Sequence, residues 1–545
     1  MKDPGHYQAL KARVRRELDK PQVRRNFRQA MDGIRARRAE QFAEPGYFEA
    51  LRERARAIRQ KALDRLPELL DRLERQLERN GIRVHHAADA AEANALILDL
   101  LRRAGARSVI KGKSMVSEET ALNEALDDAG IQVIESDLGE YIIQLAHEPP
   151  SHIVAPAIHK NRREVAELFR EHHPELEYTE DIDRLTGNAR QVLRERFACA
   201  DAGISGVNFA VAETGTLVLV ENEGNGRLST TAPPLHIAIT GIEKVVESLD
   251  EIPPLLEILT KSATGQPITT YVNFISRPRQ PDELDGPREV HLVLLDNGRS
   301  RIREDEALAE TLRCIRCGAC INHCPVYVQV GGHAYGSVYP GPIGSVLEPQ
   351  RLGLTEMGSL TSACTLCGAC GDVCPVGIPL PELINRLRAE AVEPDHVTHV
   401  PDAGALRRPG EALVWQLWKT LYGHPGLYRG FTWLATRLSG LTPSRLGPWT
   451  RYRSVPRPAA RTLHELARAE GIPARARKSD PAKLPAHRGV DDPIPQVQRR
   501  TCGNREECID RFIARQQAVR GEVHRLHDGD WLDWLAKELP RRGVK

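Results

Sequence analysis

The sequence has no long apolar run and no marked excess of charge of either sign. No stretch approaches the roughly 18–20 uninterrupted apolar residues of a membrane-spanning helix, so only peripheral contact with a membrane stays open. Lys and Arg number 76 and Asp and Glu number 74, for a formal net charge of +2. The strong positive charge typical of nucleic-acid-binding proteins is therefore missing, and we expect no nucleic-acid partner.

Two cofactor signatures are also missing. The chain contains no G-x-G-x-x-G dinucleotide fingerprint and no C-x-x-C-H haem attachment site. Its first residues lead into a charged helical stretch without the apolar core of a secretory signal. We therefore expect a cytoplasmic protein, in which cysteines stay reduced.

What the sequence does have is a dense group of cysteines. Eight of the 11 cysteines fall within residues 314–374, in two runs of the form C-x2-C-x2-C-x3-C-P. This spacing is the bacterial ferredoxin signature for [4Fe–4S] clusters, in which the fourth cysteine commonly ligates the neighbouring cluster. A glycine follows the second cysteine of each run and lets the backbone curl towards the cluster.

We assign four thiolates to each of two [4Fe–4S] clusters, with the fourth cysteines exchanged between the runs. The first cluster is predicted to be held by Cys314, Cys317, Cys320 and Cys374, and the second by Cys364, Cys367, Cys370 and Cys324. A structural zinc site is the alternative, but zinc needs only two C-x2-C pairs and not two complete runs. Cys199, Cys502 and Cys508 are not expected to be ligands.

The flanks of the two runs differ in charge. Arg313, Arg316 and His323 lie beside the first run, whereas Thr365 and Asp372 lie within the second. Positive charge and hydrogen bonds near sulfur raise a reduction potential, so we hypothesise that the first cluster has the higher potential. The alternative is that these side chains only face solvent.

Residues 82–300 alternate short β-rich runs with helical stretches, which predicts an α/β domain with a largely parallel sheet. Two segments beside these runs carry polar groups that could bind a ligand. One is the lysine turn after Ile110, which resembles a helix N-terminal anion site, and the other is the strand 217–220 with a glycine-bearing turn at each end. The candidate pocket residues are Lys111, Lys113, Ser114, Glu213, Thr214, Gly215, Asn222, Asn225 and Arg227.

At 545 residues the chain is too long for one hydrophobic core. The 39 residues between Cys324 and Cys364, and the helical pattern around them, favour a helical ferredoxin fold over a β-rich one. The expected units are a helical segment packed on the next domain (1–80), the α/β domain (81–300), the helical domain with two clusters (301–395), an aromatic and basic region (396–471), a linker (472–497) and a helical extension (498–545).

All six tryptophans of the chain lie at or beyond Trp415, and four of them fall in the aromatic region. Three interpretations stay open: a buried helical pair, a docking face for partner subunits, and interfacial contact with a membrane quinone pathway.

Four stretches of the α/β region, together with the two cysteine runs, carry a family resemblance. Residues 111–115, 135–144, 149–160 and 212–227 resemble the iron–sulfur B subunits of bacterial L-lactate utilisation systems, over about residues 20–460. The resemblance implies a lactate-utilisation domain similar in fold to sugar-phosphate isomerases and coenzyme A transferases. It also implies two partners, a cysteine-rich subunit and a second subunit with a lactate-utilisation domain. Beyond about residue 475 the chain departs from this family, and residues 499–545 look similar to the opening of that second subunit.

The resemblance implies a role in the oxidation of L-lactate to pyruvate, and assigns no residue to the hydride or proton step. Lactate oxidation moves two electrons whereas each cluster carries one, so we expect an electron-transfer subunit and not a self-sufficient dehydrogenase. The alternative is an enzyme whose α/β domain acts on a phosphorylated or acyl substrate, with clusters in a regulatory or structural role.

Overall fold

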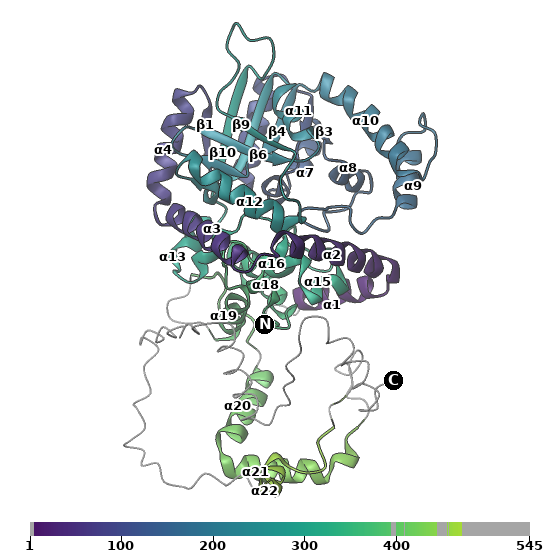
Figure 1. Ribbon diagram of the computed structural model, residues 1–545, viewed down its shortest axis with the longest axis vertical. Helices are drawn as coiled ribbons and strands as arrows, with labels where there is room; N and C mark the ends of the chain where they lie inside the picture. Colours follow the sequence, from purple (N-terminus) through teal and green to yellow (C-terminus); the bar gives the residue numbers. More distant parts are fainter. Residues whose placement is uncertain (1–4, 394–398, 408, 444–454, 456, 471–545) are drawn as a thin grey trace. The chain divides into compact units, whose positions relative to one another are not determined.

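The computed structural model describes residues 5–393, 399–407, 409–443, 455 and 457–470 (Figure 1). The chain divides into two compact units, Met1–Lys419 and Thr420–Lys545. None of the described helices is both long and apolar enough to cross a bilayer. The expected linker at 472–497 and the extension at 498–545 lie outside the described residues.

Four helices form the N-terminal segment: α1 (Gly5–Leu18), α2 (Pro21–Gln41), α3 (Tyr47–Asp64) and α4 (Leu66–Arg79). Apolar side chains three or four residues apart give each of the longer helices one buried face. In α4 this face consists of four leucines, Leu66, Leu69, Leu73 and Leu77, all of them buried. The helices are thus amphipathic and pack on the rest of the first unit.

A six-stranded sheet forms the core of the α/β region, and all five of its strand pairings are parallel. Its strand order is β1-β10-β7-β4-β2-β3. The strands are β1 (Arg83–Ala87), β2 (Ser108–Lys111), β3 (Gln132–Glu135), β4 (Ala202–Gly206), β7 (Leu235–Gly241) and β10 (Glu289–Leu295). Every residue of β7 is buried, as expected for a central strand that is covered on both faces. The expected parallel-sheet α/β fold is therefore confirmed.

Helices cover both faces of this sheet. One apolar core joins it to α5 (Ala90–Arg103) and α7 (Leu122–Asp128), and a second joins the opposite face to α4. The remaining helices of the region are α6 (Met115–Glu119), α8 (Leu138–Leu145), α9 (Arg162–His172), α10 (Ile182–Cys199), α11 (Asn225–Thr231) and α12 (Ile252–Ala263), with short 3-10 turns η1 (Ile242–Lys244) and η2 (Leu249–Glu251).

A second sheet departs from the sequence-based expectation. The runs near 207–212 and 217–220 form β5 (Phe209–Val211) and β6 (Thr216–Glu221), which pair antiparallel with each other. With β8 (Val245–Val246) and β9 (Tyr271–Ile275) they make a four-stranded sheet of order β8-β5-β6-β9. Only four residues connect β5 to β6, far too few for the crossover that a parallel pair requires.

From residue 299 onward the described part of the first unit is helical. Its elements are α13 (Arg299–Glu304), η3 (Leu308–Arg313), α14 (Ala319–Asn322), α15 (Pro325–Val330), α16 (Gly341–Leu352), α17 (Leu354–Met357), η4 (Gly358–Ser362), α18 (Ala369–Asp372) and α19 (Leu380–Val392). The long spacer between the two cysteine runs therefore folds into helices, and α16 packs against both α19 and η4.

Arg59 of α3 connects three segments inside the core. Its guanidinium is buried and donates to the carbonyl oxygens of Val245 (2.9 Å), Leu312 (3.2 Å) and Glu243. Burial lowers the pKa of this guanidinium to about 10, so it stays protonated at neutral pH. The side chain thus ties α3 to η1, β8 and η3, directly before Cys314.

Replacing Arg59 with methionine should destabilise the protein strongly. The Arg59→Met variant leaves several buried carbonyl groups without a hydrogen-bond donor. We therefore expect a loss of about 2–5 kcal/mol in the free energy of unfolding. Chemical denaturation of the cluster-loaded protein would measure it. Arg54→Met, on the exposed side of α3, is the matched control and should change stability by less than about 0.5 kcal/mol. Equal losses in the two variants would contradict the role assigned to Arg59.

The aromatic region forms α20 (Pro409–Gly423), α21 (Pro425–Arg437), η5 (Ser439–Leu441) and α22 (Leu463–Ala469). No residue of α20 is buried, and Trp415 is 61% exposed. In α21, Trp433 is 50% exposed and Thr436 is the only buried residue. The interpretation as a buried helical pair is therefore wrong for the described residues, because these rings are left on the surface.

Candidate iron–sulfur centres

The two cysteine runs follow the same backbone path. In the first, Arg316 and Gly318 have positive φ angles of 60° and 76°, and in the second Leu366 and Gly368 have 56° and 85°. Each run then enters a four-residue helix, α14 or α18. The curl points backbone N–H groups at sulfur, since those of Arg316 and Leu366 lie 3.4 and 3.3 Å from the Sγ atoms two residues before them.

The fourth cysteine of each run caps a helix or turn in the same manner. Cys324 accepts from the N–H of Tyr327 at 3.5 Å, and Cys374 accepts from the N–H of Ile378 at 3.3 Å. Such N–H···S bonds stabilise a thiolate that is a cluster ligand. The two cysteine runs therefore repeat each other in backbone structure as well as in sequence.

The first predicted thiol set surrounds a single cavity. Cys314, Cys317 and Cys320 line it together with Cys374 of the other run. The space between the lining side chains is about 350 Å³ when the adjoining open solvent is included. The rest of the lining is mostly apolar, with Ile153, Ile315, Ile343, Val376, Ile378 and Leu380. The structure thus brings together the four side chains that the exchanged assignment predicts.

The second predicted set also gathers, nearer the surface. The thiol of Cys370 is close enough to Cys324, Cys364 and Cys367 to interact electrostatically with all three. Cys370 and Cys324 are buried, Cys364 is half-buried and Cys367 is exposed. One thiol set is therefore enclosed and the other opens to solvent.

The donor sets fit iron–sulfur clusters. None of the nine cysteines in the described residues forms a disulfide. Burial and the neighbouring thiols raise the pKa of Cys370 to about 12, and burial raises that of Cys374 to about 11. Thiols packed like this around a void resist deprotonation by themselves, whereas bound cations reverse that preference. The arrangement thus suits cationic iron–sulfur cores, because each of the two sets offers four thiolates.

Buried positive charge surrounds the first set. The guanidinium of Arg316 lies over the Tyr339 ring, 4.8 Å from its centroid, and 3.5 Å from a carboxylate oxygen of Glu243. Lys244, whose pKa burial lowers to about 7, donates to the carbonyl oxygen of Cys314 at 3.3 Å. Arg313 is only 1% exposed. Arg313 and Arg316 therefore do not face solvent, and the alternative that these charged side chains only face solvent does not hold for them.

The second set has fewer cations. Thr365 and Asp372 are exposed. One guanidinium, that of half-buried Arg388 on α19, donates to the carbonyl oxygen of Cys364 at 2.6 Å. The hydroxyl of Tyr335, which sequence reasoning missed, lies beside Cys324. The two thiol sets therefore differ in both charge and exposure.

In the α/β region, the lysine turn meets the start of α11. A side chain at Gly112 would contact Gly226, because its Cβ would lie 3.8 Å from that Cα. Lys111 is fully buried, with Nζ 2.7 Å from Glu135 and 3.1 Å from Glu118. Lys113 donates to the carbonyl oxygen of Val154 at 2.7 Å. Here Ser114 caps α6 and Asn225 begins α11.

The remaining candidate pocket residues lie elsewhere. Glu213, Thr214 and Gly215 pack on α4, where the carbonyl oxygen of Thr214 accepts from Asn80 at 2.8 Å. At the other end of β6, Asn222 pairs with Thr270 and Arg227 stacks on Tyr271. The nine residues therefore do not form one pocket, because the two turns lie at opposite ends of one strand. Sequence reasoning did not single out Glu135 and Glu140, although both fall within its 135–144 stretch.

Glu140 gives the α/β region an expected pH dependence. Burial raises the pKa of its carboxyl to about 8, above the value of about 4.3 in an unfolded chain. The folded state then retains a proton that the unfolded state releases, so Glu140 lowers stability progressively as the pH rises from about 4.5 to 8.

The Glu140→Gln variant should therefore match the parent protein near pH 5 and exceed it at pH 8. We expect a gain on the order of 1–3 kcal/mol at the higher pH. Thermal unfolding across this range would measure it, with Glu124→Gln on the exposed side of α7 as control. Parallel pH profiles for the two variants would show that Glu140 does not titrate in this way.

Comparisons with known families match three parts of the chain. Residues 70–295 match the LUD domain, residues 310–378 match the 4Fe-4S dicluster domain, and residues 386–472 match the C-terminal region of lactate utilisation protein B. A LUD domain followed by a 4Fe-4S dicluster region defines an iron–sulfur protein of the lactate-utilisation class.

Relatives agree over most of the chain. Lactate utilization protein B of Bacillus velezensis is 43% identical over 83% of this chain and 94% of its own length. That of Bacillus subtilis is 41% identical over 83% and 94%. The uncharacterized electron transport protein YkgF of Escherichia coli is 41% identical over 82% and 94%. The chain belongs to the lactate utilization protein B family.

Proposed function

We propose that the chain carries electrons, through two [4Fe–4S] clusters, in a cytoplasmic complex that oxidises L-lactate to pyruvate. The observation that carries the proposal is that the eight thiols gather in two sets, one enclosed and one open to solvent. Membership of the lactate utilization protein B family supports the substrate, and the name of the Escherichia coli relative supports the transport of electrons.

The protein would hold both clusters in one helical frame. The first three cysteines of each run lie on a curled loop. The fourth ligand would come from the other run, so neither cluster would be complete without the other run. Each cluster, when bound, accepts or releases one electron at a time. Apolar side chains around the first set, among them Ile153 and Ile343, limit the access of water to it.

The second set is suited to exchange electrons with another protein. Cys367 is exposed, and the adjacent Leu366 is 43% exposed. Lactate gives up two electrons in one oxidation, so a redox centre on another subunit has to split the pair. We propose that this subunit is one of two partners, a cysteine-rich protein and a second protein with a LUD domain.

The alternative of an enzyme acting on a phosphorylated or acyl substrate is not favoured. It requires Glu213 and Arg227 in a single pocket with the lysine turn, but Glu213 packs near α4 while Arg227 stacks on Tyr271. Lys111 is already neutralised by two carboxylates.

Anaerobic purification with the two partner subunits tests the proposal. Adding L-lactate should produce the electron paramagnetic resonance signal of reduced [4Fe–4S] clusters within the time of turnover. The same mixture without this chain, or with D-lactate, is the control. If dithionite reduced the clusters but L-lactate with both partners did not, the role in lactate oxidation would be refuted.

A further inference from the structure

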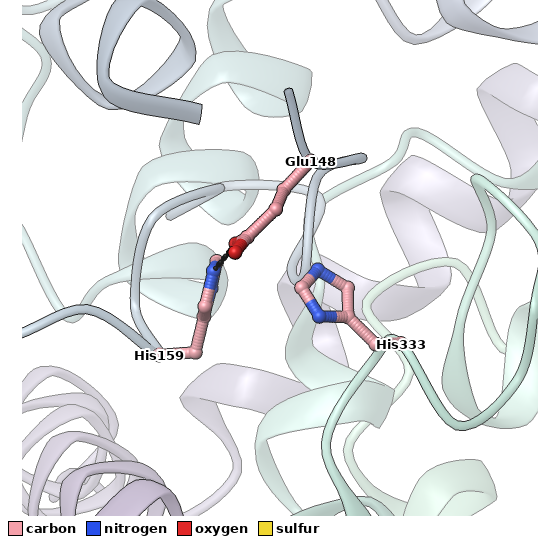
Figure 2. A group of neighbouring side chains, drawn as sticks. All are labelled: Glu148, His159 and His333. Carbon is pink, nitrogen blue, oxygen red and sulfur yellow. Dashed lines mark hydrogen bonds and ion pairs between the residues drawn. The ribbon is translucent and has the colours of Figure 1, made fainter. Parts of the chain in front are cut away.

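A third group of metal-ligating side chains lies apart from the cysteines. Glu148 and His159 belong to the loop between α8 and α9, and His333 follows the Gly331-Gly332 turn after α15. Each offers one ligand atom, and these atoms all lie within 4.8 Å of one another. Figure 2 shows the carboxylate of Glu148 directed at the His159 ring, with the His333 ring beside them.

We infer that Glu148, His159 and His333 bind one divalent transition-metal ion of the zinc type. Two imidazoles and a carboxylate are a common donor set for zinc and for other first-row divalent metals. Bonds of about 2.0–2.1 Å at tetrahedral angles put donor atoms about 3.3 Å apart. The three ligand atoms lie within 4.8 Å of one another, so the side chains would turn to reach this spacing when the ion binds.

The surroundings orient the ligands as metal sites do. The Nε2 atom of His333 lies 2.8 Å from the carbonyl oxygen of Pro149, which accepts its proton and leaves Nδ1 free to bind a cation. Lys160 holds one oxygen of Glu148 at 2.6 Å, while the other oxygen is 2.6 Å from Nε2 of His159. Outer hydrogen bonds such as those made with Lys160 and Pro149 fix metal-binding carboxylates and histidines in place.

The His159 and His333 rings lie close to each other at the site, with their centroids 4.6 Å apart. His159 is 8% exposed, and its Nδ1 is buried without a hydrogen-bond partner in the described part of the chain. A buried polar atom of this kind calls for a partner that is not a protein group.

The site would fasten two parts of the first unit together. The loop that carries Glu148 and His159 also carries Ile153, which lines the cavity of the first thiol set, and Val154, which binds Lys113. His333 lies nine positions beyond Cys324. A metal ion here would therefore hold the loop between α8 and α9 against the segment that follows Cys324, a predicted ligand of the second cluster.

Metal content and coordination of the cluster-loaded protein test the inference. The protein is incubated anaerobically with equimolar Zn²⁺, separated from free metal, and analysed for zinc and iron and by X-ray absorption at the zinc edge. We expect one zinc per chain with only nitrogen and oxygen neighbours, in addition to the cluster iron. Zinc below about a tenth of an equivalent, or zinc with sulfur neighbours, would overturn the site.

Variants locate the ion. His333→Ala and the isosteric Glu148→Gln should each weaken zinc binding at least about tenfold, while iron content and the cluster absorbance stay unchanged and report that the protein is folded. His172→Ala, on an exposed position of α9, is the matched control and should retain the zinc. Zinc that remains in both ligand variants would place the ion elsewhere and overturn the assignment.

Discussion

Replacing Cys374 with alanine is expected to abolish the enclosed first cluster. The second cluster should remain, although most of its predicted ligands belong to the same run as Cys374. The reason is that Cys374 completes the cavity of Cys314, Cys317 and Cys320. Anaerobically reconstituted Cys374→Ala should contain about four irons per chain, against about eight in the parent protein. Iron and sulfide analysis would measure the loss.

Two double variants distinguish exchanged from unexchanged ligation. With exchange, Cys317→Ala combined with Cys374→Ala removes two ligands of one cluster and should still leave about four irons. Cys364→Ala combined with Cys374→Ala damages both clusters and should leave almost none. Without exchange the two results swap. Cys199→Ser, at an exposed cysteine outside the runs, should retain all the iron.

Replacing Arg316 with glutamine should lower the reduction potential of the enclosed cluster. Reduction adds negative charge, which the buried guanidinium stabilises. A unit charge about 6 Å away contributes roughly 2–3 kcal/mol at an effective dielectric constant of about 20, and Glu243 cancels part of it. We therefore expect a fall of about 50–100 mV, measured by potentiometric titration with electron paramagnetic resonance detection.

Two further variants test the origin of this shift. Arg316→Lys keeps the charge and should retain most of the potential. Arg388→Gln, beside the second set, should move the other cluster's potential and leave that of the enclosed cluster in place. If Arg316→Gln left both potentials unchanged, or if Arg316→Lys fell as far as Arg316→Gln, charge at this position would not set the difference between the clusters.

The sequence predicted the thiol sets because cluster ligation is encoded at short range. Spacings of two and three residues determine which cysteines can curl round one cluster, and a repeated run supplies the exchange. The parallel sheet was also predictable from apolar β-rich runs such as β7. In contrast, β4 escaped notice because it contains Gly203 and Gly206 in place of β-branched residues. Gly203 is required where α11 comes so close that a Cβ would lie 1.7 Å from the carbonyl oxygen of Ser229.

Long-range contacts account for what the sequence did not predict. The short connection between the strands at 209–211 and 216–221 indicates that they pair antiparallel, but nothing local indicates that they form a separate sheet. The candidate pocket therefore included the turn at 213–215, which lies at the far end of β6 from the lysine turn. The group of Glu148, His159 and His333 was likewise invisible, because His333 stands far along the chain from the other two. The exposure of the tryptophans in α20 and α21 depends on packing partners and not on their helical pattern.

The N-terminal helices depend on a segment synthesised some three hundred residues later. Arg13 of α1 donates to the carbonyl oxygens of Ala334 and Tyr335, at 3.1 and 3.2 Å. Phe27 of α2 packs edge-on against Tyr327, with ring centroids 5.4 Å apart. During synthesis α1 and α2 emerge well before these partners, so their packing cannot be completed until the first cysteine run has been translated. Their docking would therefore complete only at the stage when iron and sulfide can also enter, which links maturation of the cofactors to closure of the fold.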